Sequence, residues 1–474
     1  MFAKKIDTLY KIINIAALLF LSIIFVASLK VNILDKQNID VSHFLYLFLS
    51  ISGILVFINI IKNIPLKFLV PGLLILSFIL RLWWINAIDT QPNSDFLMLL
   101  NAAKELSIGE TDIIKHHPSN YFYKYPYNLS FVLYETAVYK LFHAVYAFKL
   151  INVLLSTFIV WLIFLISKQV FNEKTALIAM TFSAIFPPFI YINSILTNQI
   201  LAFALILSAI YLFLKKKKFL YIGLLLAFAN LIRPVAIVFL AGIFIYYSLN
   251  IFKKQIGFNK KFFMDYLKSI TLLIGTYYLT IFIVFTAINL TKIPVVSMFH
   301  DPIPNYKFLV GLNPASNGRY NNEDSSLASN FENYKIESTQ KIKERLTNKT
   351  QLLKLFKTKI KDFWGHKNSE LFWSFSGVPP QYQYYKFAYY EWMLYLSFVF
   401  FSILFLVKAI FYSQKKTNII VFFNLLLLMF GFIYLFIEIQ ARYRYSIYFI
   451  FIILSAGGAG MLFKQGINTK IKNH

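Results

Sequence analysis

The sequence has no cysteine and few charged residues, acids above all. Of its 474 residues, 21 are Asp or Glu and 47 are Lys or Arg, so charged residues make up 14% of the chain. The absence of cysteine excludes a disulfide framework, an iron–sulfur cluster, a thiolate zinc site and a cysteine nucleophile. Because a soluble domain has roughly a quarter of its residues charged, the composition also argues against an ordinary water-soluble fold.

Apolar residues dominate instead. Hydrophobic residues make up 58% and aromatic residues 19% of the chain, and the mean hydropathy is +0.62. A membrane-spanning helix needs about 20 apolar residues, and we therefore predict an all-α polytopic membrane protein with about 12 transmembrane helices. These candidates lie near residues 10–29, 43–61, 68–88, 150–168, 175–192, 198–214, 219–232, 235–251, 269–290, 387–408, 418–437 and 446–463.

The first apolar stretch is too long for a signal peptide and lacks a small-residue cleavage site, so we interpret it as a retained span. The formal net charge of +26 lies largely in short lysine runs between apolar stretches. Such runs mark cytoplasmic loops, so we expect no nucleic-acid partner. The predicted inner positions are Lys4, Lys5, Lys11, Lys62, Lys67, Lys168, Lys174, Lys215 to Lys218, Lys253, Lys254, Lys260, Lys261, Lys415 and Lys416.

The connections near 191–197 and 233–234 contain no lysine, which places them outside. Both termini then face the cytoplasm, and we expect a multi-pass protein of a bacterial plasma membrane. Two outer segments are too long to be simple connectors, and long loops are usually functional. This divides the chain into an N-terminal membrane region with a first outer loop (1–290, loop 89–149), an extracytoplasmic loop domain (291–386) and C-terminal membrane helices (387–474).

Amphipathic helices are expected in both outer segments. Apolar residues of the first recur at helical spacing after Asp95, and a Tyr125-Pro126 turn follows. The second begins with the Pro- and Asn-rich stretch DPIPNYKFLVGLNPASNGRYNNED and continues as a polar helical region to about residue 363.

Asp95 is the first candidate for chemistry, because it follows the third span at the start of a predicted helix. One interpretation is helix capping, since Asn93, Ser94 and Asp95 are all favoured around an N-cap. The other is a general base at the outer membrane face, with its ionised form favoured by the helix dipole. The spacing alone does not separate the two.

Several cations stand at unusual places. Arg81 lies inside an apolar stretch, where it marks a functional site or snorkels to the interface beside Trp83 and Trp84. Arg233 precedes Pro234 at a predicted break between two helices on the outer side. A guanidinium there can bind a phosphate through paired donors, or it can have a purely structural role.

The stretch HHPSNYFYKYPYNL offers Lys124 and Tyr125 as groups for a phosphate or sugar, with an interfacial aromatic belt as the alternative. Adjacent histidines rarely face one ion, so His116 and His117 are a weak metal pair. We predict no metal site.

The outer turn before the last predicted span holds Glu438, Arg442, Tyr443 and Arg444. Two arginines there depart from the positive-inside pattern. A permanently charged pair suits an anionic head group such as a lipid phosphate. The structural alternative is that Glu438 pairs with one of the arginines.

In their order and topological side, these motifs resemble the GT-C superfamily of polytopic glycosyltransferases. The resemblance is to the bacterial protein O-mannosyltransferases and the aminoarabinose transferases of lipid A (glycosyltransferase family 39-like), and it covers most of 68–250 and 430–460. The motifs on which the resemblance rests are RLWW…QPNSDF with Ala103 and Gly109, Tyr125-Pro126, Lys149 to Asn152, Gly223 to Pro234 and the R-Y-R of Arg442 to Arg444. Many relatives have a second acid near the aspartate, whereas Asp95 lies between Ser94 and Phe96.

The resemblance implies an enzyme that transfers a sugar from a polyprenyl-phosphate donor to an extracytoplasmic acceptor (glycan, lipid or protein) with inversion. Asp95 would be the general base, and cations would hold the leaving phosphate. No cofactor is required, and metal dependence stays open. The donor-phosphate and substrate set is Arg81, Lys124, Tyr125, Arg233, Glu438, Arg442, Tyr443 and Arg444.

Two other classes of protein share parts of this pattern. An O-antigen ligase or polymerase also has about twelve spans and a large late outer loop, and His300 or His366 would then replace Asp95 as the important residue. A lipid-linked sugar flippase or transporter is the non-enzymatic alternative, although transporters carry such charges near the bilayer midplane.

The predicted topology is testable with reporters. A reporter fused after Lys216 should be active in the cytoplasm, and one inserted near Asn330 should be active outside, because lysine-rich loops stay inside. The measurement is the activity of paired compartment-specific reporter enzymes. The opposite result at either position would contradict the orientation.

Overall fold

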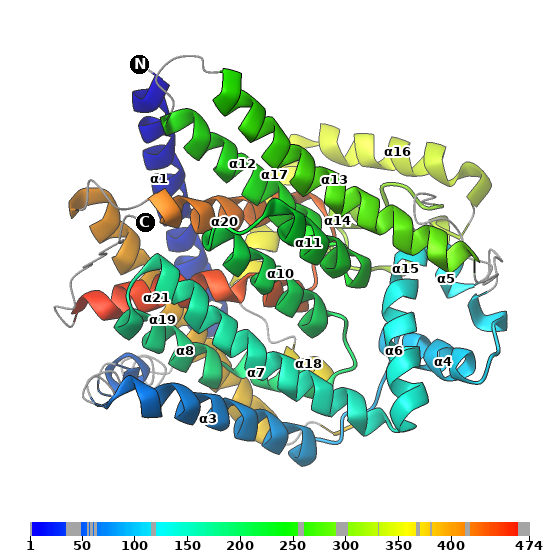
Figure 1. The fold of residues 1–474 in the computed structure, drawn as a ribbon. Coiled ribbons are helices and arrows are strands. Elements are labelled where there is room, and N and C mark those ends of the chain that lie inside the picture. Colours follow the sequence, from blue (N-terminus) through cyan, green and yellow to red (C-terminus); the bar gives the residue numbers. More distant parts are fainter. Residues whose placement is uncertain are drawn as a thin grey trace.

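The computed structural model describes residues 2–34, 49–54, 56, 60, 64–114, 120–254, 260–290, 302–329, 331–365, 370–379, 382–412 and 418–462. Over these residues the regular elements are helices, and none is a strand. Figure 1 shows long helices packed side by side, with shorter helices gathered at the right-hand end.

Seven helices are long and apolar enough to cross a membrane, or eight if a bent pair counts as one span. The bent pair is α8 (Glu173–Ile185) with the segment Pro187–Ser194 that contains α9 (Pro187–Tyr191), at 58°. The other seven are α1 (Phe2–Leu29), α3 (Leu66–Ala87), α7 (Val145–Val170), α12 (Ala236–Lys254), α13 (Lys260–Leu290), α19 (Tyr382–Tyr412) and α20 (Asn418–Phe436).

Three further apolar helices are shorter: α10 (Gln199–Leu214), α11 (Phe219–Ile232) and α21 (Tyr448–Leu462). The prediction of an all-helical polytopic membrane protein is thereby confirmed. Most of the predicted span at 43–61 lies outside the described residues, so the number of twelve spans remains a prediction.

Helix α21 occupies the centre of the bundle. Its residues from Phe449 to Gly460 are all buried, as expected for a helix that is apolar on every side. It packs against α19 and α8. A Cβ atom on Gly458 would lie 2.0 Å from the Phe401 carbonyl oxygen, so glycine permits the close contact with α19.

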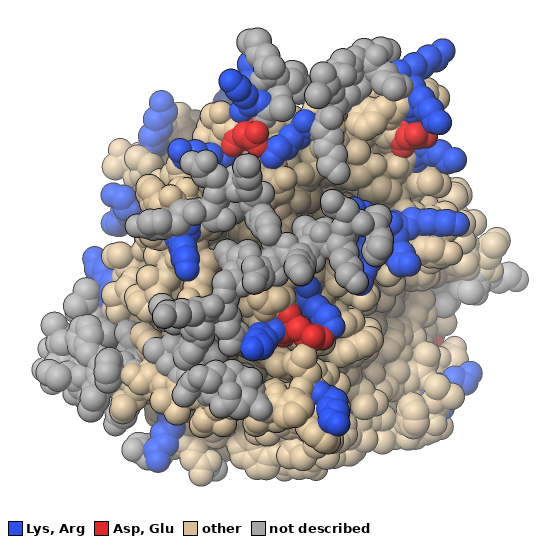
Figure 2. Space-filling view, turned by 60° about the vertical axis from the view of Figure 1, so that its left-hand side comes forward, with Lys and Arg blue, Asp and Glu red and all other residues tan. Residues whose placement is uncertain are grey.

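One end of the bundle carries many basic side chains (Figure 2). In Figure 1 the N-terminal end of α1 and the C-terminal ends of α7 and α12 lie on the left. Figure 2 brings that side forward and shows many Lys and Arg side chains but few acids. The lysines at 215–218 between α10 and α11 are exposed, as are Lys168 and Lys174. These lysines are among those that the sequence pattern assigns to cytoplasmic loops.

The predicted outer segments supply the helices at the other end. The first contains α4 (Asp95–Ser107), η2 (Asp112–Ile114), α5 (Tyr121–Lys124), η3 (Pro126–Asn128) and α6 (Leu129–Phe142). The second contains α14 (Tyr306–Gly311), α15 (Asn322–Leu327), α16 (Phe331–Thr347), α17 (Lys349–Lys359), η5 (Ile360–Trp364) and α18 (Glu370–Ser374). Helices α4, α5, α6 and α15 lie on the right of Figure 1.

A buried ion pair organises the second outer segment. Asp324 is fully buried and accepts hydrogen bonds from Arg345 Nη2 at 2.9 Å and from the amides of Asn313 and Asn321 at 2.8 Å each. Burial alone would raise the pKa of Asp324, but these donors hold it below its usual value. The carboxylate therefore stays charged and connects α14, α15 and α16.

This segment docks on the turn that follows α20. The backbone N–H of Glu438 donates to the Lys307 carbonyl at 2.8 Å, and that of Ile439 donates to the Gly318 carbonyl at 2.9 Å. Lys359 Nζ donates to the carbonyls of Gly311, Leu435 and Ile437 at 2.7–2.9 Å. Side-chain and backbone contacts thus fix the outer segment against the membrane helices.

Gly311 permits this docking and gives a test of it. A Cβ there would lie 2.2 Å from the Ile437 carbonyl carbon and 2.5 Å from the Glu438 nitrogen. We expect Gly311→Ala to destabilise the protein by about 1–3 kcal/mol, because such overpacking forces backbone shifts. The measurement is thermal unfolding in detergent, together with protease sensitivity of the second outer segment.

Gly275→Ala is the matched control, because nothing lies within 4 Å of a Cβ on Gly275, within helix α13. Alanine should be neutral or favourable there. If Gly311→Ala were as stable and protease-resistant as Gly275→Ala, the close docking would be refuted.

Candidate active site

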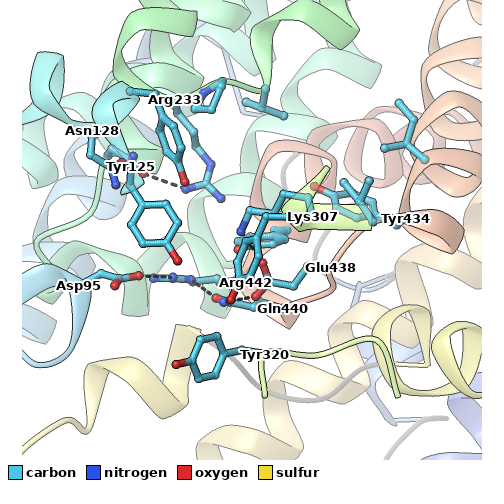
Figure 3. A pocket seen from close by; sticks show the side chains of 18 of the residues that line it. Asp95, Tyr125, Asn128, Arg233, Lys307, Tyr320, Tyr434, Glu438, Gln440 and Arg442 are labelled. Carbon is cyan, nitrogen blue, oxygen red and sulfur yellow. Dashed lines mark hydrogen bonds and ion pairs between the residues drawn. The ribbon is translucent and has the colours of Figure 1, made fainter. Parts of the chain in front are cut away.

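A cavity of about 590 Å³ lies where both outer segments meet the ends of the membrane helices. Its walls come from the start of α4, the Tyr125 turn, the α11–α12 break, α14, the end of α20 and the turn η6 (Ala441–Ser446). Figure 3 shows the side chains that line it. The charged lining residues are Asp95, Arg233, Lys307, Glu438 and Arg442.

The backbone before α4 directs Asp95 into the cavity. Ser94 has φ 52° and ψ −132°, and its side chain makes no capping hydrogen bond. A residue held in such a sparsely populated region is strained and is common at functional sites. Asp95 is the first helical residue, its side chain is 50% exposed, and it lines the cavity. A capping hydrogen bond is therefore not what holds Ser94 and Asp95 in place.

A row of polar side chains runs from Asp95 across the cavity wall (Figure 3). Arg442 Nη2 lies 4.0 Å from Asp95 Oδ2, and Arg442 Nε donates to Gln440 Oε1 at 2.8 Å. Gln440 Nε2 donates to Glu438 Oε1 at 3.0 Å, and Lys307 Nζ forms an ion pair with the other carboxylate oxygen of Glu438. The row alternates acids and donors, so each charge has a neighbour of opposite sign.

Arg442 is held rigidly within this row. Its guanidinium lies 4.8 Å from the Phe96 ring centroid and 5.2 Å from that of Trp373, and its carbonyl accepts from Gln199 Nε2 at 2.6 Å. Arginine between aromatic rings keeps its orientation while its outer nitrogens stay able to bind an anion.

Arg233 approaches the cavity from the helix break. The α11 helix ends at Ile232, and Pro234 prevents its continuation. Arg233 Nη1 donates to Asn198 Oδ1 at 2.8 Å, and the guanidinium lies 5.1 Å from the Tyr443 ring centroid. The break thus places a cation beside the amide of Asn198 in the cavity wall.

Two tyrosines of the cavity, Tyr125 and Tyr127, stay protonated at neutral pH. Burial raises the pKa of Tyr125 and of Tyr127 above the ordinary value of a phenol. They can therefore donate hydrogen bonds but cannot serve as a base. Of the two carboxylates among the described lining residues, Glu438 is 3% exposed and is engaged by Lys307 and Gln440, so Asp95 is the more accessible one.

Three residues of the predicted set lie elsewhere. Arg81 is fully buried, and its guanidinium donates to Ser156, Ser77, Ala184 and Ser183 at 2.9–3.1 Å, so it braces α3 against α7 and α8. Lys124 donates to Ser329 Oγ at 2.8 Å and does not line the cavity.

Arg444 points away from the cavity into the protein. Its guanidinium lies 5.6–5.8 Å from the rings of Phe363, Tyr395 and Tyr448 and is attracted by the carboxyls of Glu370 and Glu391. Burial, with Glu391 nearby, raises the pKa of Glu370 to about 8. The predicted pair of arginines is therefore separated in the structure: Arg442 lines the cavity, whereas Arg444 packs among aromatic rings in the interior.

Lys307, Gln440 and Asn198 line the cavity but were not predicted. Lys307 lies in the Pro- and Asn-rich stretch that the sequence already distinguished from a linker, and that was the one available signal. Among the described residues, no group of three or more His, Asp or Glu side chains could hold a metal ion. His116 and His117 lie outside these residues.

Comparison with known families gives one match. Residues 136–286 match the family "Dolichyl-phosphate-mannose-protein mannosyltransferase", which is less than half of the chain. No curated protein matches the chain. The matched part runs from α6 to α13 and includes the Arg233 break, whereas Asp95 and Arg442 lie outside it. The match confirms the resemblance to GT-C glycosyltransferases that the motifs indicated, on an all-helical polytopic membrane protein.

Proposed function

We propose that the cavity transfers a sugar from a polyprenyl-phosphate donor to an extracytoplasmic acceptor, with inversion at the anomeric carbon. One observation supports this most. Segments far apart in the sequence bring an accessible carboxylate, Asp95, beside three cations, Arg233, Lys307 and Arg442, in one cavity at the end of the membrane helices.

The charges of the cavity suit a leaving phosphate. The lining has three cations against the two acids Asp95 and Glu438, so it keeps an excess of one positive charge. Burial opposes the charged form of Lys307, but Tyr443 and Glu438 outweigh it and hold the pKa of Lys307 above its usual range. The ammonium therefore stays charged at neutral pH and can bind an anion.

The remaining wall suits a lipid tail. Val235, Ile237 and Val238 from the start of α12, with Phe430 and Ile433 from α20, form an apolar side of the cavity. Ile237 is 40% exposed on a helix that is long and apolar enough to cross the membrane. A polyprenyl chain can thus leave the cavity between apolar side chains toward the lipid while its phosphate stays near the cations.

The transfer step follows from these positions. Asp95 accepts the proton of the acceptor hydroxyl as its oxygen bonds to the anomeric carbon. The bond between that carbon and the phosphate oxygen breaks, and the electron pair leaves with the phosphate. Arg442, Lys307 and Arg233 stabilise the charge that develops on the leaving group. Attack and departure occur on opposite faces, which inverts the anomeric centre.

No specific observation favours the two alternative classes of protein, a ligase or polymerase and a transporter. His300 and His366, which would matter in a ligase or polymerase, lie outside the described residues. A transporter would need its binding groups near the midplane, whereas the cavity lies at the end of α20, beside η6. In the predicted topology this end faces the outside, which places the reaction at the outer face of a bacterial plasma membrane.

The role of Asp95 can be tested by Asp95→Asn. Asparagine is also a good residue near an N-cap, so the helix start should persist. The amide cannot accept a proton at neutral pH, and we expect turnover to fall about 10²-fold or more while donor binding persists. The measurement is sugar transfer from a polyprenyl-phosphate donor in nanodiscs.

Asp89→Asn is the matched control. Asp89 lies in the same outer segment, is 85% exposed and does not line the cavity, so its loss should leave turnover nearly unchanged. Near-normal turnover of Asp95→Asn would show that Asp95 is not the base.

The proposed binding of the donor phosphate by Arg442 can be tested separately. Replacing Arg442 with Gln removes a cation from the cavity, and hydrogen bonds to charged groups contribute about 1.5–3 kcal/mol. We expect Arg442→Gln to weaken donor binding by about 10- to 100-fold, measured by titration of the purified protein with the donor. Lys124→Gln is the control, because Lys124 bonds to Ser329 outside the cavity. Equal donor affinities of the two variants would show that Arg442 does not bind the donor phosphate.

A further inference from the structure

Helix α17 and the η5 turn after it have two different faces. Leu355, Lys359 and Phe363 are 1–3% exposed and face the protein interior. Lys354, Lys357 and Lys361, spaced by three and four residues, share another face, as this spacing dictates on a helix. The first face holds the outer segment against α20, whereas Lys354 and Lys357 of the second face are exposed.

The lysine face borders a groove of about 670 Å³ beside α1. Helix α1 contributes Leu19, Ile23 and Val26, which are 60%, 49% and 61% exposed. The η5 turn packs against α1, and Asn32 Nδ2 donates to the Gly365 carbonyl at 3.2 Å, so the two sides of the groove are fixed to each other. The groove shares no lining residue with the cavity of the proposed active site.

The charges at the groove are of one sign. Lys30, Lys354 and Lys357 are exposed, and over the described part of the chain they form no ion pair with an acid. No acidic residue is among the described residues that line the groove. Three exposed ammonium groups beside an apolar groove favour a partner that has both a negative charge and an apolar part.

The depth of the groove matches one leaflet of a bilayer. Leu19 and Lys30 are eleven residues apart in sequence, which is about 16 Å along a helix that rises 1.5 Å per residue. The hydrocarbon core of a bilayer is about 30 Å thick, so half of it is about 15 Å. Because α1 is long and apolar enough to span the membrane, lysines at its end lie at head-group level while Leu19 lies near the midplane.

We propose that this groove is a binding site for an anionic phospholipid. Its acyl chains lie along Leu19, Ile23 and Val26, and its phosphate lies among Lys30, Lys354 and Lys357. In the predicted topology this lipid belongs to the outer leaflet. The site exists whether or not the cavity transfers a sugar, because it depends on α1, α17 and η5 and not on Asp95 or Arg442.

Lipid in the groove also stabilises the docking of the second outer segment. Lys359, on the interior face of α17, donates to the Leu435 and Ile437 carbonyls next to Glu438 of the cavity. A ligand that binds the folded arrangement stabilises it in proportion to its occupancy. Anionic lipid should therefore raise the unfolding temperature of the protein.

The test is native mass spectrometry of the full chain in detergent, titrated with phosphatidylglycerol or phosphatidylcholine. We expect wild-type protein to retain phosphatidylglycerol selectively. A basic residue near anionic lipid contributes about a fivefold factor, so the triple variant K30Q/K354Q/K357Q should lose at least about tenfold in affinity. The increase in unfolding temperature caused by phosphatidylglycerol should disappear with it.

The matched control is K335Q/K343Q/K349Q, which removes three exposed lysines of α16 and α17 that do not line the groove. It should keep wild-type lipid selectivity. Equal binding of both lipids by the wild type, or equal losses in the two triple variants, would overturn the proposal. Displacement of phosphatidylglycerol from the wild type by equimolar polyprenyl phosphate would assign the groove to the carrier and overturn it as well.

Discussion

The cavity proposed as the active site depends on one contact, the docking of the second outer segment on the turn after α20. Backbone hydrogen bonds of Glu438 and Ile439, to Lys307 and Gly318, join the two segments directly. Without this contact Lys307 would not face Glu438, and the row of side chains that ends at Asp95 would be interrupted. Lys359 adds to this contact by donating to the Leu435 and Ile437 carbonyls, since the C-terminal end of a helix leaves its carbonyls unpaired. The end of a membrane helix thereby becomes the floor of a cavity.

The cost of burying charge explains how the ionisable residues are distributed. A buried ion that lacks partners is strongly destabilising, and three buried cations of this protein each have partners. Arg81 contacts carbonyls and a hydroxyl, and Arg444 lies near carboxyls and aromatic rings. Lys359 donates to three carbonyls. These cations hold helices together. In contrast, the 4.0 Å separation of Arg442 from Asp95 is too long for a hydrogen bond. These buried cations differ in this way from Arg442, which lines the cavity and remains able to bind a ligand.

The sequence correctly predicted an all-helical polytopic membrane protein, because apolar length is a local signal, but among the described residues seven helices, or eight with the bent pair, are long and apolar enough to span a membrane. It also placed Asp95, Tyr125, Arg233, Glu438, Arg442 and Tyr443, all of which line the cavity. It could not separate Arg442 from Arg444, since the side-chain directions in a short 3-10 turn depend on packing. It could not select Lys307 either, because that residue reaches the cavity through docking between segments 131 residues apart. Local pattern locates helices and motifs, whereas contacts between distant segments decide which polar groups meet.

Helix α17 connects the two sites that the structure suggests. Its interior face carries Lys359, whose ammonium holds the carbonyls at the end of α20, and its other face carries the lysines of the groove beside α1. A change in one face of a short helix moves the other, because a helix is stiff over three turns. The η5 turn strengthens this connection, since Phe363 packs on Tyr434 of the cavity wall at 4.6 Å between ring centroids. Lipid bound at the groove therefore acts on the same helix that positions Glu438, and the membrane becomes part of what holds the cavity in shape.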